Sequence, residues 1–196
     1  MALTDIERDT ILWSQFRNGD TESFVSIFRN YYSDLFNYGC KITDDRSLIE
    51  DCIQDLFIDL WRTNGKAEII SLKPYFFRAF KFKLIKAIGK TGKTNSLQED
   101  VQQNEFEISH EMFLINNESN EELRQRVFKA IDELSARQKE IIYLKFYQNL
   151  NYEEVSEIMN INYQAARNLI YQSIKVLKKI ITVQLILWIF FKLFLF

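Results

Sequence analysis

The 196-residue sequence is poor in the side chains that build metal centres and nucleophilic active sites. It contains one histidine, His110, and two cysteines, Cys40 and Cys52, which do not form a CxxC pair. A zinc site or a Ser-His-Asp or Cys-His arrangement needs more of these residues than the chain supplies. The two thiols are expected to be reduced and partly buried, as in a cytoplasmic protein. We therefore expect a protein that is not an enzyme and that holds no metal or other cofactor.

Helix-breaking residues and a secretory signal are also scarce or absent. One proline and five glycines favour long helices over a turn-rich β fold. Residues 1–20 show neither an apolar core nor a cleavage signature, which argues against a secretory signal peptide. The net charge of −2 gives no indication of a nucleic-acid partner. The local distribution of charge, in contrast, indicates such a partner.

Helical periodicity recurs in both halves of the chain. Asp20 is a candidate N-cap for apolar positions spread over 24–36, a second helix follows the polar cluster 43–45, and a third starts near Pro74 and fades near Gly89. In the second half, one helix is predicted around 123–134. Ser135 and Gln138 form a capping-box pattern for another, which is expected to run through Phe146. The sequence thus predicts an all-α fold.

An acidic stretch divides the two halves. Residues 94–122 contain eight acidic residues and no lysine or arginine. We interpret this stretch as an interdomain linker, with a short helical piece around 106–115. The predicted organisation is an N-terminal helical domain at 1–93, the linker, a second helical domain at 123–179 and an apolar tail at 180–196. An acidic loop inside a single domain is the alternative.

The strongest local pattern is a helix-turn-helix in the second half. Asn151 and Glu154 can cap a short helix, Asn160 can adopt the left-handed conformation of a tight turn, and Asn162 can cap the next helix. A helical projection of that second helix collects polar and basic residues on the side opposite its apolar face. These residue types read base edges and hold phosphates, although an ordinary solvated face is the alternative. The candidate DNA-binding residues are Gln164, Arg167, Asn168, Tyr171 and Lys175.

A second basic helix lies in the first half. Residues 73–93 contain seven lysines and arginines and no acid. Basic side chains interleaved with aromatic ones suit a single DNA strand, whose phosphates need cations and whose unstacked bases need flat partners. A solvated basic helix with its aromatics folded onto the core is the alternative. The candidate residues are Tyr75, Arg78, Lys81, Phe82, Lys83, Lys86 and Lys90.

The segment 44–61, DDRSLIEDCIQDLFIDLW, resembles the core-binding region of the extracytoplasmic-function (ECF) sigma factors of RNA polymerase. The resemblance continues through the basic helix, which in that family recognises and opens the minus-ten promoter element, and through the helix-turn-helix, which reads the minus-thirty-five element. It implies a promoter-specificity subunit whose partners are core RNA polymerase and promoter DNA. The positions that the family pattern assigns to polymerase binding are Asp51, Gln54, Asp55, Phe57, Leu60 and Trp61.

Two details qualify the resemblance. Phe82 stands where many members have asparagine, and Asn160-Ile161 replaces a frequent Gly-Ile turn. The version rich in phenylalanine and lysine resembles the Bacteroidetes branch, whose members often work with a membrane anti-sigma factor. Two rival hypotheses remain: a stand-alone regulator that uses only its helix-turn-helix, and a membrane-associated helical adaptor.

The apolar tail at 180–196 is not explained by the family resemblance. Its length reaches only the lower edge of the roughly 17–25 residues that span a bilayer. Three interpretations stay open: packing on the protein or an anti-sigma partner, peripheral membrane contact, and a spanning helix. We expect a cytoplasmic protein that is associated with the membrane through the tail or the anti-sigma factor.

Overall fold

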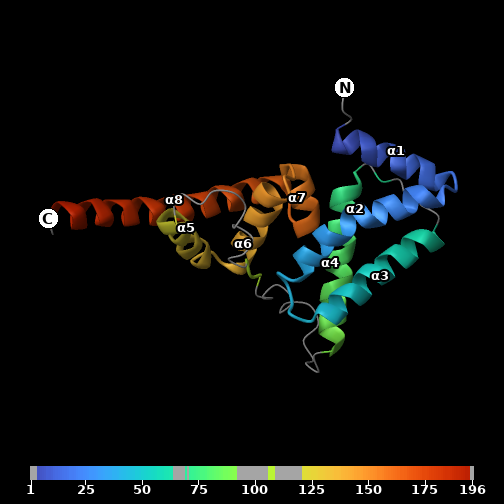
Figure 1. Ribbon diagram of the computed structural model, residues 1–196, viewed down its shortest axis with the longest axis horizontal. Helices are drawn as coiled ribbons and strands as arrows, with labels where there is room; N and C mark the ends of the chain where they lie inside the picture. Colours follow the sequence, from blue (N-terminus) through green and yellow to red (C-terminus); the bar gives the residue numbers. More distant parts are fainter. Residues whose placement is uncertain (1–3, 64–68, 70, 92–105, 109–120, 195–196) are drawn as a thin grey trace. The chain divides into compact units, whose positions relative to one another are not determined.

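The computed structural model describes residues 4–63, 69, 71–91, 106–108 and 121–194 (Figure 1). Its described residues contain helices and no strand, which confirms the predicted all-α class. The chain divides into two compact units, Met1–Asn104 and Glu105–Phe196. We call them the N-terminal unit and the C-terminal unit.

The N-terminal unit consists of α1 (Asp5–Arg17), α2 (Thr21–Gly39), α3 (Arg46–Arg62) and α4 (Leu72–Thr91). Side-chain caps start three of these helices: Thr4 caps α1 within a capping box, Asp20 caps α2 and Asp45 caps α3. Each cap accepts a hydrogen bond from an N–H that the helix itself leaves unpaired. The predicted cap at Asp20 and the predicted start of the second helix after 43–45 are confirmed.

Aromatic side chains from all four helices form the core of the N-terminal unit. Phe16, Phe76, Phe77 and Phe80 are fully buried, and Tyr38 packs on Phe77 with the ring centroids 5.1 Å apart. Burial of each such ring stabilises the fold by about 1.5–3 kcal/mol. Phe76, Phe77 and Phe80 thus place one face of the basic helix α4 in the core.

Gly39 lets α2, α3 and α4 approach each other closely. A Cβ atom at this position would lie 2.8 Å from Ile49 Cγ2 and 3.0 Å from Phe80 Cζ. Ile49 and Phe80 are themselves fully buried, so neither can move aside cheaply. A residue without a side chain is thus required where the three helices meet.

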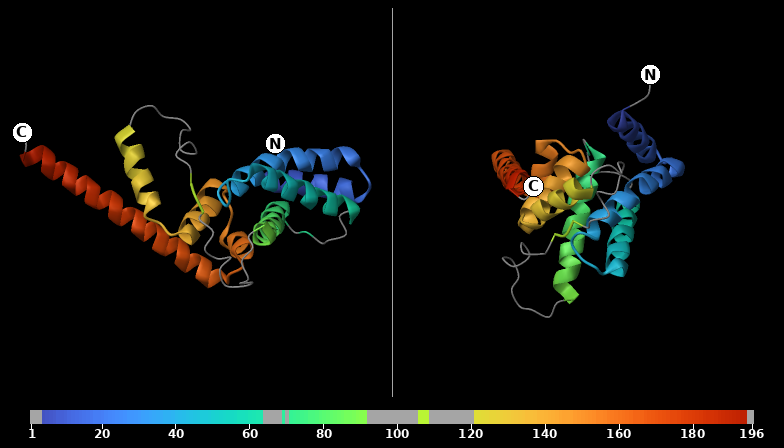
Figure 2. Two further views of the ribbon diagram at one scale, coloured as in Figure 1. Left: turned by 90° about the horizontal axis from the view of Figure 1, so that it is seen from below. Right: turned by 60° about the vertical axis from the view of Figure 1, so that its left-hand side comes forward.

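The C-terminal unit consists of α5 (Glu121–Asp132), α6 (Ala136–Ile142), the π-helical turn η3 (Tyr143–Tyr147), α7 (Tyr152–Met159) and α8 (Tyr163–Phe194). Helices α5, α6 and α7 all pack against α8 (Figure 2). The capping boxes predicted at Ser135 and Asn151 are both present.

Two predictions for this half are wrong in detail. The helix that begins after Ser135 changes to π-helical geometry at Tyr143, and Phe146, which is 60% exposed, lies in this π-helical turn. Residues 106–108 are not helical; Phe106 is buried and packs on Tyr143 at 5.7 Å. This part of the predicted linker is therefore packed in the C-terminal unit, and the rest of 94–120 lies outside the described residues.

Helix α8 extends well past the segment that packs on the other helices. In Figures 1 and 2 it continues beyond the far end of α5 to the end of the chain. The apolar tail thus prolongs the second helix of the helix-turn-helix as one uninterrupted helix. Within the described part of the chain, no helix combines the length and apolar composition that crossing a membrane requires.

Candidate nucleic-acid interface

The turn of the helix-turn-helix has the predicted geometry. Asn160 ends α7 in the left-handed conformation, with φ 51° and ψ 50°. Asn162 Oδ1 accepts a 2.7 Å hydrogen bond from the backbone N–H of Ala165 and so caps α8. Because Ala166 and Ile170 are buried against α7 and its neighbours, the opposite side of α8 is fixed toward solvent.

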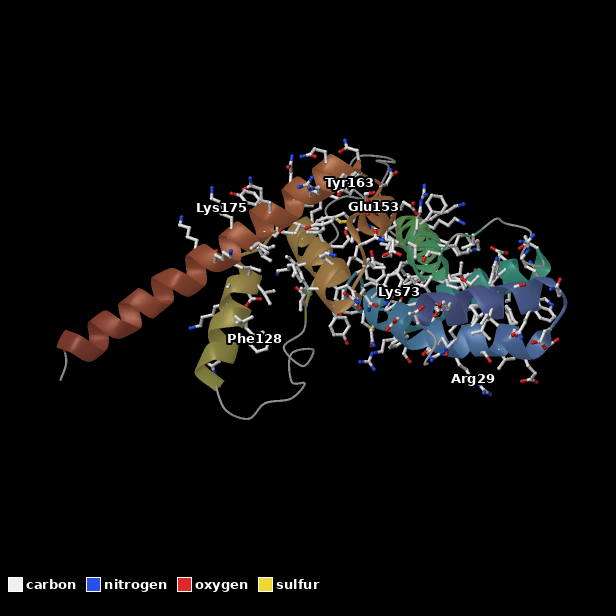
Figure 3. The ribbon with its side chains drawn as sticks, turned by 90° about the horizontal axis from the view of Figure 1, so that it is seen from above. Arg29, Lys73, Phe128, Glu153, Tyr163 and Lys175 are labelled. Atoms are coloured by element: carbon white, nitrogen blue, oxygen red, sulfur yellow. The ribbon has the colours of Figure 1, made fainter. Side chains whose placement is uncertain are left out.

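The candidate DNA-binding residues of α8 all lie on this solvent side. All five candidates, Gln164, Arg167, Asn168, Tyr171 and Lys175, are exposed. Gln164 Nε2 donates a 3.1 Å hydrogen bond to Asn168 Oδ1, which holds two amide side chains side by side. Figure 3 shows Lys175 extending from α8 on the side away from α5. The arrangement provides adjacent donors and acceptors in the first turns and a cation farther along the helix.

Sequence reasoning missed Tyr163 as a member of this surface. It is 41% exposed, its ring packs edge-on to Tyr152 with the centroids 6.0 Å apart, and the guanidinium carbon of Arg167 lies 5.8 Å from its centroid. Tyr163 thereby orients Arg167 and links the surface to α7. The signal was present in the sequence, because an arginine four residues after an aromatic lies on the same helix face.

On α4, the predicted basic face separates into two groups. Arg78, Phe82, Lys86 and Lys90 are exposed and follow one another at four-residue intervals, so they form a single row. Phe82 is 68% exposed, and Lys86 Nζ lies 6.0 Å from the centroid of its ring. We call these four residues the α4 row.

The other candidates on α4 are partly buried. Tyr75, Lys81 and Lys83 are of intermediate exposure. Lys83 Nζ forms a 2.6 Å ion pair with Asp59 Oδ2 of α3. Burial, with a smaller contribution from the charge of Asp59, raises the pKa of Tyr75. These three side chains pack mainly within the N-terminal unit and reach less far into solvent than the α4 row does.

On α3, the six residues assigned by the family pattern do not share one environment. Asp51, Gln54 and Asp55 are exposed, and Trp61 is 48% exposed while its ring packs on Phe24 with a centroid separation of 4.9 Å. Phe57 and Leu60 are 3% and 2% exposed. The assignment of a binding surface to these two residues is therefore corrected: they belong to the hydrophobic core and hold α3 in place.

Ile58 is a surface residue that the sequence interpretation overlooked. It is 45% exposed and projects between Asp51, Asp55 and Trp61 on a straight helix. An exposed isoleucine and a half-exposed tryptophan among carboxylates are typical of a contact with another protein. We call Asp51, Gln54, Asp55, Ile58 and Trp61 the α3 face.

The described residues contain no group of three His, Cys, Asp or Glu side chains placed to hold a metal ion. His110 lies outside the described residues. The electrostatic character of the chain is set instead by the acidic α3 face and the two basic surfaces on α4 and α8. These features suit binding to macromolecules.

Comparison with protein families identifies sigma-70 region 4 at residues 124–177. This span covers the described helices from α5 through the first half of α8, including the helix-turn-helix. The independent family match thus falls on the same residues as the exposed readers of α8.

Three curated relatives extend the similarity over most of the chain. The ECF RNA polymerase sigma factor SigM of Bacillus subtilis (strain 168) is 22% identical over 153 residues, covering 78% of this chain and 91% of SigM. The sigma factor YlaC of the same strain is 24% identical over 168 residues, with coverages of 82% and 93%. The ECF sigma factor SigK of Mycobacterium sp. (strain JLS) is 22% identical over 187 residues, with coverages of 89% and 90%.

A solved structure, that of CnrH in complex with the cytosolic domain of CnrY, shares the fold. One chain of that structure superposes with a TM-score of 0.57 at 14% identity, covering 90% of this chain and 98% of the other. The fold, the region 4 match and the three relatives agree with one another. The chain is thus similar to RNA polymerase sigma factors, including two of the ECF type, over most of its length, and to sigma-70 region 4 at residues 124–177.

Proposed function

We propose that this chain binds core RNA polymerase through the α3 face and directs it to promoters, where it recognises and opens DNA. Three separate exposed surfaces support the proposal: an acidic and apolar one on α3, a basic and aromatic one on α4, and a polar and basic one on α8. The observation that carries it is the presence of the α3 face in a chain that also has a region 4 helix-turn-helix. A regulator that only binds duplex DNA has no use for that face.

The proposed division of labour follows the chemistry of each surface. The α4 row offers cations and an exposed ring, which suits the phosphates and unstacked bases of a melted minus-ten strand. On α8, Gln164, Arg167 and Asn168 are proposed to read bases in the major groove of the minus-thirty-five element, and Lys175 to hold the backbone. Tyr75, Lys81 and Lys83 are proposed to contact minus-ten DNA as partly buried residues at the edge of the α4 row. The chain supplies no catalytic chemistry of its own in this scheme.

The proposal includes further partners. We infer a Bacteroidetes-type factor from the phenylalanine-rich and lysine-rich α4, in which Phe82 replaces the usual asparagine. Such a factor is expected to be held by a membrane anti-sigma factor, and the structure of CnrH with CnrY is a precedent for a bound second protein. The apolar tail is proposed to contact the membrane, and the domain boundaries 1–93, 94–122, 123–179 and 180–196 are retained as part of this proposal.

The test is run-off transcription with core polymerase purified from the source organism, with and without this protein. Protein-dependent transcripts with defined starts are expected. Replacement of Asp55 by lysine or of Ile58 by glutamate should abolish them, because both changes alter the α3 face without touching the core. Glu133→Lys is the matched control, since Glu133 is an exposed acid just after the end of α5 and lies outside the α3 face.

Each alternative outcome has a defined meaning. Loss of transcription in Glu133→Lys as well as in Asp55→Lys would contradict a specific α3 interface. No transcripts, no binding to core polymerase and retained duplex binding would favour the stand-alone helix-turn-helix regulator. No binding to polymerase or DNA would favour the membrane adaptor.

A further inference from the structure

Helix α8 carries two different surfaces in succession, and only the first is used by the proposed promoter contact. Its first half bears the DNA readers, and its second half continues beyond α5 (Figures 1 and 2). Residues 180–194 are apolar apart from Thr182, Gln184 and Lys192. A helix that is apolar on all sides needs a non-aqueous environment.

The charge pattern of α8 indicates what that environment is. The helix contains no acidic residue along its whole length. Lys178 and Lys179 are both exposed and lie immediately before the apolar segment. We call these two residues the basic collar. Cations placed just outside an apolar helix complement an anionic lipid surface, because their charges reach the headgroups while the adjoining helix enters the apolar layer.

Alternative occupants are less consistent with this pattern. A second copy of the chain packed parallel on α8 would bring two basic collars together, and no carboxylate on α8 could neutralise them. An α8 buried in its own unit would need other elements beside its second half, yet the described helices of the C-terminal unit leave that half extending past them (Figure 3). The segment 180–194 measures about 22 Å at 1.5 Å per residue, which is shorter than the bilayer hydrocarbon core of about 30 Å.

We infer that the second half of α8 is an anchor for anionic lipid surfaces, inserted partway into one leaflet and fixed by the basic collar. This inference deepens the membrane contact proposed above, because it names the lipid class and the residues that recognise it. Each collar lysine near an anionic surface strengthens binding about fivefold. The anchor therefore depends jointly on the tail and on Lys178 and Lys179.

The test is flotation of the purified full-length chain with vesicles, in the absence of polymerase and DNA. One set of vesicles contains equal parts of phosphatidylglycerol and phosphatidylcholine, and the other contains phosphatidylcholine alone. The wild type is expected to float with the anionic set. Deletion of 181–196 and the double variant I186E/F190E, which keeps the full length, should both remain unbound.

The collar is tested with matched pairs of cations. K178Q/K179Q is expected to weaken partitioning about 25-fold, as two lysines contribute about fivefold each. K129Q/R137Q removes two exposed cations from α5 and α6 and should float like the wild type. Circular dichroism checks that each variant is folded.

Several results would overturn the inference. Equal flotation of I186E/F190E and the wild type would show that the tail does not mediate binding. Equal binding to both vesicle sets would show that the basic collar does not recognise anionic lipid. A folded wild type that stays unbound and dimerises through the tail in sedimentation would assign the surface to a second copy. Since no step uses polymerase, a failure here is distinguishable from a failure of the sigma assignment.

Discussion

Lys83 of α4 and Asp59 of α3 form an ion pair, with 2.6 Å between Nζ and Oδ2. The pair joins the helix of the proposed minus-ten surface to the helix of the proposed polymerase surface. Their side chains are 29% and 57% exposed, so the pair contributes no more than about 1 kcal/mol to stability. Its main effect is to hold Lys83 against α3, away from the α4 row.

This pair predicts unequal roles for the aromatic and basic residues of α4. Phe82→Ala is expected to weaken binding of a melted minus-ten strand by about 1–3 kcal/mol, because a stacking partner is lost. Lys83→Gln should have a much smaller effect, since its ammonium group is already engaged with Asp59. Fluorescence anisotropy of the polymerase complex with a labelled fork-junction promoter measures both. Phe82→Tyr, which keeps the ring, is the control, and equal losses in Phe82→Ala and Lys83→Gln would contradict the prediction.

The surroundings of Gly39 and Gly89 predict opposite effects of a glycine-to-alanine substitution on stability. Gly39→Ala should destabilise the N-terminal unit by about 1–3 kcal/mol, because the added methyl group collides with Ile49 and Phe80. Gly89→Ala should stabilise it by up to about 1 kcal/mol, because a Cβ there meets nothing within 4 Å and alanine favours the helix. Urea unfolding measures both free energies. A neutral Gly39→Ala would show that the three helices can separate without cost.

Tyr75 predicts a loss of stability at alkaline pH. Its pKa is raised above the ordinary value of about 10, first by burial and then by the charge of Asp59. The folded state therefore keeps the proton that the unfolded chain releases, so the contribution is complete below pH 10 and is lost as the pH rises through the folded pKa. Thermal unfolding of the wild type and Tyr75→Phe between neutral and strongly alkaline pH tests this. The two curves should diverge above pH 10, with Tyr75→Phe the more stable, and parallel curves would contradict it.

Arg167 and Lys175 predict two different signatures of duplex binding. Arg167→Ala should cost about 1–3 kcal/mol on the preferred sequence and relax the preference at one base pair. Lys175→Gln should weaken binding uniformly across sequences and lower the salt dependence by about one phosphate contact. Titration of the polymerase complex with minus-thirty-five variants at several salt concentrations separates the two. Equal changes in specificity for both variants would contradict the proposed roles.

Local polar patterns were the most predictive part of the sequence. The caps at Asp20, Ser135 and Asn151 and the left-handed Asn160 depend on hydrogen bonds within a few residues, so the sequence determines them. Helix α1 was missed although Thr4 and Glu7 form a capping box. Its apolar side chains are sparse, and the face that it buries is defined by packing on the other helices of the N-terminal unit, mainly α2.

Burial was less predictable where it depends on tertiary packing. The apolar positions after Ser135 predicted one helix through Phe146, whereas the structure has the π-helical turn η3 at Tyr143–Tyr147 and Phe146 is exposed. Phe57 and Leu60 looked like binding residues because the family pattern includes them, whereas the helices around them enclose both. Ile58 was overlooked for the converse reason: an apolar residue is normally assigned to the core.

Because α8 is one continuous helix, it sets a fixed length between promoter reading and lipid anchoring. Arg167 and the start of the apolar segment at 180 are separated by about 20 Å of helix. That length is less than the diameter of a small domain, about 30 Å, so no folded domain fits along α8 between the proposed DNA-binding residues and the proposed anchor. In the proposed scheme, promoter DNA held by α8 would therefore lie within about 20 Å of helix from the lipid surface.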